Sequence, residues 1–229
     1  MEKKEILVDP EKVEWEKIAL PGIQVKYLYK NEQTLYDFSP FHPDIFKVVY
    51  TALGVPEQAR RTVRMVKSRK VGVSSVRGLD HGVWTILRHL FPADDISMFQ
   101  LSIDFAQPPR FHCDLGRELL PLRAEEVLII GSGNIVHNLM QVAWDNADSP
   151  ADGWSESFDG KVAELLRKGR HDELIDYETL DEAATAVPTK DHCVPLLYAI
   201  SLQEKEEKIE FLHEGFQYAN ISMRCLPIV

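Results

Sequence analysis

The stretch VLIIGSGNIVHNL, residues 127–139, joins an apolar run, a turn with two glycines and a histidine. The run at residues 127–130 predicts a buried strand, and Gly131 and Gly133 predict a tight turn into a helix that carries His137. In open α/β folds, side chains that follow the carboxyl end of a strand line the ligand site. His137 is therefore the first candidate for chemistry. The alternative is that the glycines only permit a sharp turn and that His137 is a buried, hydrogen-bonded helix residue.

Segments on the N-terminal side of this stretch alternate between strand and helix patterns. The predicted elements are a strand at 23–29, a helix from Pro56, a loop and helix at 78–92, a strand at 96–103 and an amphipathic helix at 111–123. Strand–helix–strand order favours parallel neighbours joined by right-handed crossovers. We therefore predict an α/β fold, with residues 1–229 forming a single domain around a central, mostly parallel sheet flanked by helices.

The C-terminal side continues with helices and ends in two strands. A helix at residues 156–169 is predicted to end on Gly169, where glycine is favoured. Asp191 and His192 precede Pro195 and an apolar helix, which places both polar residues near a helix start. The last two segments, 208–215 and 220–229, are predicted strands.

Composition excludes several classes of protein. The formal net charge of -10 and the lack of a long basic run argue against a nucleic-acid partner. No segment approaches the roughly 18 apolar residues of a membrane-spanning helix, and the charged N-terminus does not fit a signal peptide. Three scattered cysteines indicate a reducing compartment. We expect a cytoplasmic protein that binds a small molecule and does not bind membranes; a homo-oligomer is left open.

Three of the eight histidines share one setting. His81, His137 and His192 each lie in a predicted loop or first helical turn, beside Gly, Asp or Asn. Such positions converge at one edge of a wound sheet, and converging imidazoles suit a divalent metal or proton transfer near neutral pH. The alternative is that Asp80 and Asp191 are helix caps and that the neighbouring histidines are only hydrogen-bonded.

Several spaced motifs together resemble one known family. They are GLDHGVWTILRHLFP (78–92), QLSID (100–104), LRAEEVLIIGSGNIVHNL (122–139), AVPTKDHCVPLLYAIS (186–201) and ISMR (221–224). In this order they resemble the 4,5-DOPA extradiol dioxygenases of the class III, protocatechuate 4,5-dioxygenase-type, ring-cleaving superfamily. The resemblance runs from about residue 36 to residue 224, most of the chain.

The resemblance implies a mononuclear non-haem Fe(II) site, with Zn(II) sometimes in its place, and a catecholic, DOPA-like substrate that reacts with O2. It implies that His192 binds the metal, that His137 acts as acid and base, and that His81 lines the pocket. The residues expected to contact the substrate are Asp80, Asn138, Asp191 and Arg224.

The N-terminal region departs from this family. Its members carry two further metal-binding histidines, in a Ser-His-Gly turn and in a His-Trp pair before a Tyr-Asp-Phe sequence. This chain has Tyr36-Asp37-Phe38, but its first histidine is His42, which follows that sequence and reads as a loop residue. Glu14-Trp15 is a weak candidate for a remnant of the His-Trp pair. Either the true N-terminal segment is missing from this sequence, or the metal site has been lost.

Three functions follow as hypotheses. In ring cleavage, the metal would orient catechol and O2 while His137 transfers protons. A metal-free binding or regulatory protein would keep the fold and the pocket without oxygen chemistry. A metal-dependent hydrolase would use His137 with water, and its turnover would not require O2.

Overall fold

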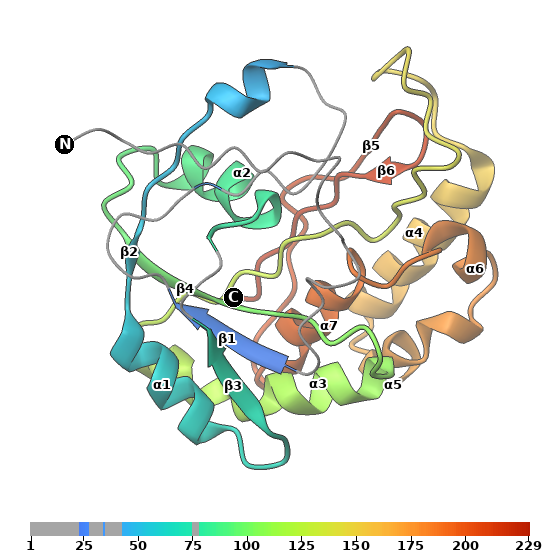
Figure 1. The fold of residues 1–229 in the computed structure, drawn as a ribbon. Coiled ribbons are helices and arrows are strands. Elements are labelled where there is room, and N and C mark those ends of the chain that lie inside the picture. Colours follow the sequence, from blue (N-terminus) through green and yellow to red (C-terminus); the bar gives the residue numbers. More distant parts are fainter. Residues whose placement is uncertain (1–22, 28–33, 35–42, 75–77) are drawn as a thin grey trace. The chain divides into compact units, whose positions relative to one another are not determined.

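The computed structural model describes residues 23–27, 34, 43–74 and 78–229 as a mixture of helices and paired strands (Figure 1). The chain divides into two compact units. The first comprises Met1–Pro56 and Val71–Ser102, and the second comprises Glu57–Lys70 and Ile103–Val229. The Tyr36-Asp37-Phe38 sequence, His42 and Glu14-Trp15 lie outside the described residues.

A four-stranded sheet with the order β2-β4-β1-β3 forms the first unit. Its strands are β1 (Ile23–Tyr27), β2 (Leu53–Gly54), β3 (Val71–Ser74) and β4 (Ser97–Leu101). Strand β1 is parallel to β3, and β2 is parallel to β4, whereas β1 and β4 are antiparallel. The predicted α/β class with mostly parallel pairing is confirmed. The strands predicted at 23–29 and 96–103 are observed as β1 and β4.

Helix α2 (His81–Leu90) supplies much of the core of this unit. Its apolar residues recur at helical spacing, and it ends just before Pro92, which cannot continue a helix. The buried core residues are Tyr50, Ala52, Leu79, Trp84 and Leu87. A short 3-10 helix, η3 (Pro43–Lys47), precedes β2.

The second unit is mainly helical. Its elements are α1 (Pro56–Met65), α3 (Pro109–Glu118), η4 (Leu120–Glu125), α4 (Gly153–Arg167), α5 (His171–Ile175), η5 (Tyr177–Thr179), α6 (Ala183–Ala186) and α7 (Val194–Ser201). Helix α3 packs along α7, and α4 contacts α5 and α6. Gly169 lies just beyond α4 with a φ of 64°, the left-handed conformation that favours glycine after a helix.

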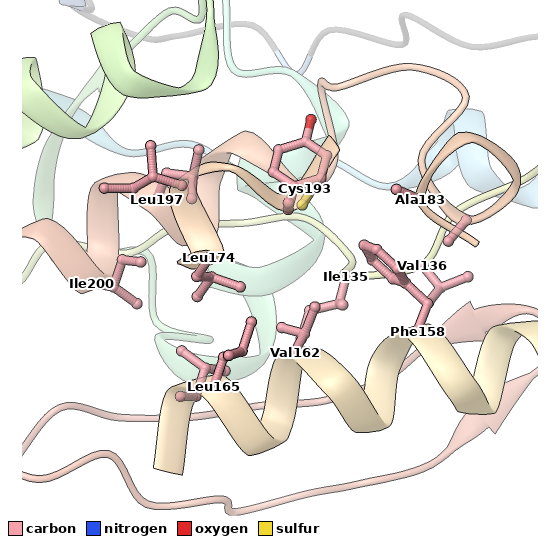
Figure 2. Close-up of a cluster of buried hydrophobic side chains, with 14 of the residues drawn as sticks. Ile135, Val136, Phe158, Val162, Leu165, Leu174, Ala183, Cys193, Leu197 and Ile200 are labelled. Carbon is pink, nitrogen blue, oxygen red and sulfur yellow. The ribbon is translucent and has the colours of Figure 1, made fainter. Parts of the chain in front are cut away.

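The core of the second unit lies between α4, α5 and α7 (Figure 2). Phe158, Val162 and Leu165 project from one face of α4 into this cluster, and Leu197 projects into it from α7. Ile135 belongs to the same cluster although it lies in an irregular segment. Burial of this residue fixes the chain just before His137.

The two C-terminal segments predicted as strands pair with each other, although little of the pairing is regular. Strands β5 (Phe216–Gln217) and β6 (Ile221–Ser222) are antiparallel. Beyond them, Lys208 and Val229 exchange two backbone hydrogen bonds of 2.7 and 2.9 Å. The two segments therefore form one irregular antiparallel ribbon.

The predicted strand at residues 127–130 is wrong. These residues have no regular secondary structure, and no strand among the described residues pairs with them. Leu128 and Ile130 are 69% and 42% exposed. An apolar run forms a strand only when a neighbouring strand accepts its backbone hydrogen bonds, which the run itself does not reveal.

The helix predicted to carry His137 is also wrong, because no helix covers this residue. The backbone N–H of Asn134 donates to His192 (2.9 Å), and that of His137 donates to Ala186 (3.0 Å). Ile221 forms an antiparallel bridge with His137. Tertiary partners therefore take the backbone hydrogen bonds that a helix would have used within itself.

None of the helices in the described ranges is long and apolar enough to cross a membrane.

Candidate functional site

The rings of His137 and His192 lie face to face. Their centroids are 3.5 Å apart and their planes differ by 9°. Both residues are partly buried in the second unit. Two of the three predicted histidines are thus brought together, although they are far apart in sequence.

The glycine turn before His137 holds the backbone against His192. A Cβ atom on Gly133 would lie 2.1 Å from the carbonyl oxygen of His192, so only glycine fits there without a shift. A Cβ on Gly131 would lie 2.5 Å from the carbonyl oxygen of Pro195. The glycines therefore permit a close approach between two segments, and they do not form the predicted turn from strand to helix.

Asn134 binds His192 through both its backbone and its side chain. Its N–H donates to the His192 carbonyl oxygen (2.9 Å), and its Oδ1 lies 3.2 Å from His192 Nδ1. Its Nδ2 donates to the carbonyl oxygen of Ser222 (2.7 Å), which fixes the orientation of the amide. His192 Nδ1 must then carry the proton in the neutral ring, so Nε2 is its unprotonated nitrogen.

Asp191 lies beside that nitrogen. Its Oδ2 is 3.6 Å from His192 Nε2, too long for a hydrogen bond. Its Oδ1 is buried and has no hydrogen-bond partner. Cys193, the residue after His192, is buried in the core, and this burial raises the pKa of its thiol to about 12. Cys193 is therefore a neutral, apolar side chain at this position.

Asn138 is buried, and both ends of its amide contact backbone. Its Nδ2 donates to the carbonyl oxygen of Thr185 (2.8 Å), and its Oδ1 accepts from the N–H of Met140 (3.0 Å). These bonds favour a role in fixing the loop after His137 over direct contact with substrate. The predicted substrate contact is not tested by them.

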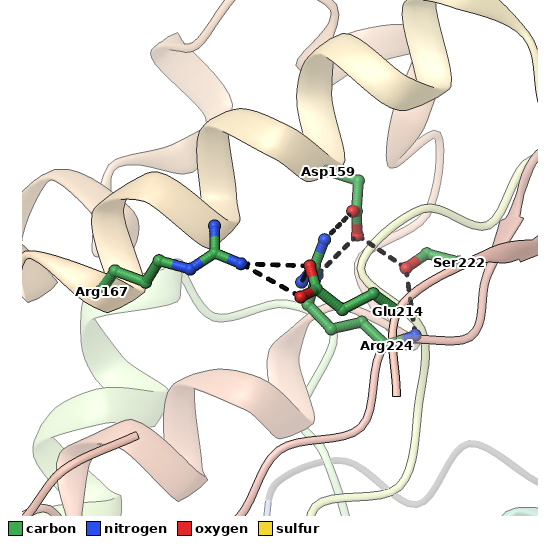
Figure 3. Close-up of polar contacts among 5 residues, drawn as sticks. All are labelled: Asp159, Arg167, Glu214, Ser222 and Arg224. Carbon is green, nitrogen blue, oxygen red and sulfur yellow. Dashed lines mark hydrogen bonds and ion pairs between the residues drawn. The ribbon is translucent and has the colours of Figure 1, made fainter. Parts of the chain in front are cut away.

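Arg224 is held inside an ion-pair network (Figure 3). Its Nε donates to Asp159 (3.2 Å), and its remaining nitrogens pair with Asp159 and Glu214. Its guanidinium also lies over the ring of Phe211, 4.8 Å from the centroid. Only 5% of its side chain is exposed, so these contacts favour a structural role.

Asp80 and His81 lie in the first unit. Asp80 precedes α2 and accepts a hydrogen bond from Gln100 Nε2 (2.8 Å), and His81 is the first residue of the helix. The convergence of His81 with the other two histidines stays a prediction, because His81 belongs to a different unit.

Of the two aspartates that could be helix caps, Asp80 lies at a cap position and Asp191 does not. Asp80 occupies the N-cap position of α2 but makes no capping hydrogen bond through its side chain. The N-cap of α7 is Cys193, so Asp191 lies two residues before the cap position. The Asp80 carboxylate instead accepts from Gln100, and that of Asp191 lies near His192.

A metal site requires three convergent protein ligands, and the described residues do not supply them. Within residues 43–74 and 78–229 and the shorter described pieces, no group of three or more His, Cys, Asp or Glu side chains is placed to hold a metal. An ion between the stacked rings would lie outside both ring planes, where imidazole has no lone pair. This part of the chain fits the predicted metal with one ligand, His192, at most.

The sequence is similar to a family of ring-opening enzymes. The family model described as the catalytic LigB subunit of aromatic ring-opening dioxygenase matches residues 6–224. The chain belongs to the LigB family. This match spans both compact units. The single-domain arrangement itself stays a prediction.

Curated relatives agree with this assignment. The 4,5-DOPA dioxygenase extradiol of Escherichia coli K12 is 35% identical over 85% of this chain and 73% of its own length. The protein of the same name from Beta vulgaris is 34% identical over 80% of this chain and 69% of its own length. The crystal structure of an uncharacterized protein from Escherichia coli K12 is similar to this LigB-family chain, with a TM-score of 0.76 and 32% identity. The similarity covers 90% of this chain and 80% of the chain in that crystal structure.

Proposed function

We propose that this chain is an extradiol dioxygenase that opens a catecholic, DOPA-like ring with O2. The relatives named as 4,5-DOPA dioxygenases support the reaction class. The observation that carries the proposal to particular residues is the stack of His137 on His192. The alternative of a metal-free binding protein has no support among these relatives, which are named as dioxygenases.

His137 is proposed as the acid and base. Ring opening begins with loss of a proton from a catechol hydroxyl, and an imidazole exchanges protons near neutral pH. The segment that carries His137 is anchored by Ala186 and Ile221, so the ring keeps its place beside His192. The fixed amide of Asn134 accepts from Nδ1 of His192, so Nε2 is the unprotonated nitrogen of the neutral ring and is the proposed metal-binding atom.

A non-haem metal, Fe(II) or Zn(II), is part of the proposal, with His192 as one ligand. It would supply orientation of the diol and of O2. Metal content tests this part. After loading with Fe(II), an enzyme should retain close to one equivalent, whereas less than about a tenth of an equivalent would contradict the proposed reaction.

Turnover separates ring cleavage from the hydrolase hypothesis. The purified chain is mixed with L-DOPA, and O2 uptake and the yellow semialdehyde product are followed together. Ring cleavage predicts that both signals appear and that both stop under nitrogen. Product formation that continues without O2 would favour a hydrolase.

Variants separate the two histidines. His137→Ala should abolish turnover and leave metal content nearly unchanged, whereas His192→Ala should lose both. The exposed His213 provides a control, and His213→Ala should change neither quantity. Equal metal loss in His137→Ala and His192→Ala would contradict the assigned roles.

A further inference from the structure

A hollow of about 450 Å³ lies in the second unit. Phe105, Thr189, Lys190 and Asp191 line it. The last three residues directly precede His192 in the chain. A molecule in this hollow would therefore lie beside the proposed reaction site.

The hollow carries one charge of each sign. Lys190 has three donors on its ammonium group, one of which donates to the carbonyl oxygen of Gln107 (3.2 Å). Its ion pair with Glu178 is long, at 4.0 Å, and 28% of its side chain is exposed. Donors on Lys190 thus remain for an anionic group.

The carboxylate of Asp191 lacks a donor. Its Oδ1 is buried without a hydrogen-bond partner, and its Oδ2 lies too far from His192 Nε2 for a hydrogen bond. A buried acceptor without a donor is unfavourable, so a ligand that brings a donor to this carboxylate would be stabilised. An ammonium group has both the donors and the charge.

The side chain of Phe105 gives the hollow an apolar wall. It is 58% exposed, so its ring can still be covered by an apolar part of a ligand. The combination of a cation, an anion and an aromatic surface fits a zwitterion attached to an aromatic group.

We propose that this hollow binds the α-amino-acid group of the substrate. Lys190 pairs with the carboxylate of the ligand and Asp191 pairs with its ammonium group. The catechol ring then points toward the histidine pair, because Asp191 contacts both the hollow and His192. This inference rests on the proposed function, and it adds Lys190 and Phe105 to the residues that determine specificity.

Anaerobic binding tests the inference without turnover. Calorimetry at pH 7 compares four catechols: L-DOPA, dopamine, 3-(3,4-dihydroxyphenyl)propanoate and 4-methylcatechol. These carry both charges, the ammonium only, the carboxylate only, or neither. L-DOPA should bind most tightly and 4-methylcatechol least tightly, with each charge contributing about tenfold in affinity.

Two variants assign the charges. Lys190→Met should weaken the two carboxylate ligands about tenfold and leave dopamine and 4-methylcatechol unchanged. Asp191→Asn should do the same for the two ammonium ligands. The controls are Lys205→Met and Asp181→Asn, which change exposed residues outside the hollow and should alter no affinity.

The outcomes separate the two proposals. If all four catechols bind to the unchanged protein with equal affinity, or if Lys190→Met weakens all four equally, the subsite is wrong while the catechol site stands. If none of the four binds, the proposed function fails, and the subsite fails with it.

Discussion

Asn134 fixes the ring of His192 through a side-chain hydrogen bond of 3.2 Å, while its own amide is oriented by the carbonyl oxygen of Ser222. The same asparagine donates its backbone N–H to His192. One residue therefore sets both the position of the His192 backbone and the proton on its ring. Partners of this kind commonly determine how well a histidine binds a metal or exchanges a proton.

Replacing Asn134 by alanine should impair catalysis more than folding. Asn134→Ala removes the acceptor at Nδ1 of His192, so the proton is free to move to Nε2. We expect kcat/KM to fall about 10- to 100-fold. The free energy of unfolding should fall by about 1–2 kcal/mol. Steady-state kinetics and urea unfolding measure the two effects.

A second asparagine provides the control for this variant. Asn146 is exposed and its side chain accepts only from the backbone of Asp148, so Asn146→Ala should leave kcat/KM unchanged. The ¹⁵N chemical shifts of the His192 ring should show one dominant tautomer in the unchanged protein and a mixture in Asn134→Ala. The same tautomer in both proteins would rule out the assigned role.

Alanine substitutions at two glycines should have opposite effects on stability. A Cβ on Gly133 meets the backbone of His192, so Gly133→Ala should lower the free energy of unfolding by about 1–3 kcal/mol. Gly160 lies within α4 with nothing inside 4 Å of an added Cβ. Gly160→Ala should raise the free energy of unfolding by about 0.5–1 kcal/mol. Urea unfolding compares them, and a Gly133→Ala variant as stable as the unchanged protein would contradict the close approach at Gly133.

The sequence predicted elements that depend on local pattern. Helix α4 has apolar residues at helical spacing and a glycine beyond its end, and both features can be read from neighbouring residues. The pairing of His137 with His192 was expected from similar local settings. The stacking of the two rings depends on contacts between segments that are distant in the sequence, and the local pattern does not specify these contacts.

The errors came from segments whose partners are remote. The run at 127–130 has the composition of a strand but lacks a pairing strand among the described residues, and residues 134–139 bond to Ala186 and His192. Asn134 was missed as a site residue because its importance depends on His192 and Ser222. In the sequence, Asn134 is marked only by its position directly after Gly133. That this glycine has no room for a side chain is known from its contact with His192.

Acid should destabilise the chain through His112. This histidine is fully buried and its Nδ1 lies 3.0 Å from the hydroxyl oxygen of Tyr198. Burial, together with the positive charge of Lys190, lowers the pKa of His112 to about 4 from 6.5. The stabilising effect of this neutral histidine is complete above pH 6.5 and is lost as the pH falls toward 4. The loss should reach about 3 kcal/mol.

A variant isolates this effect from other titrating groups. His112→Phe removes the titrating group. As the pH falls from 7 to 4.5, the free energy of unfolding should therefore decrease more in the unchanged protein than in the variant. Urea unfolding at several pH values measures that difference. His213→Gln, at an exposed site, should give a curve parallel to that of the unchanged protein. A constant difference for His112→Phe would show that His112 does not titrate abnormally.

Replacing Arg224 should lower the free energy of unfolding and should have less effect on substrate binding. Its guanidinium is paired with Asp159, and both side chains are 5% exposed. Arg224→Met would leave the Asp159 carboxylate buried with only the Ser222 hydroxyl as a donor (2.7 Å), and should cost about 3–5 kcal/mol of unfolding free energy. Arg110→Met breaks an exposed pair with Asp172 and should cost at most about 1 kcal/mol. If Arg224→Met unfolds like the unchanged protein but binds L-DOPA more weakly, the arginine contacts the substrate as the sequence predicted.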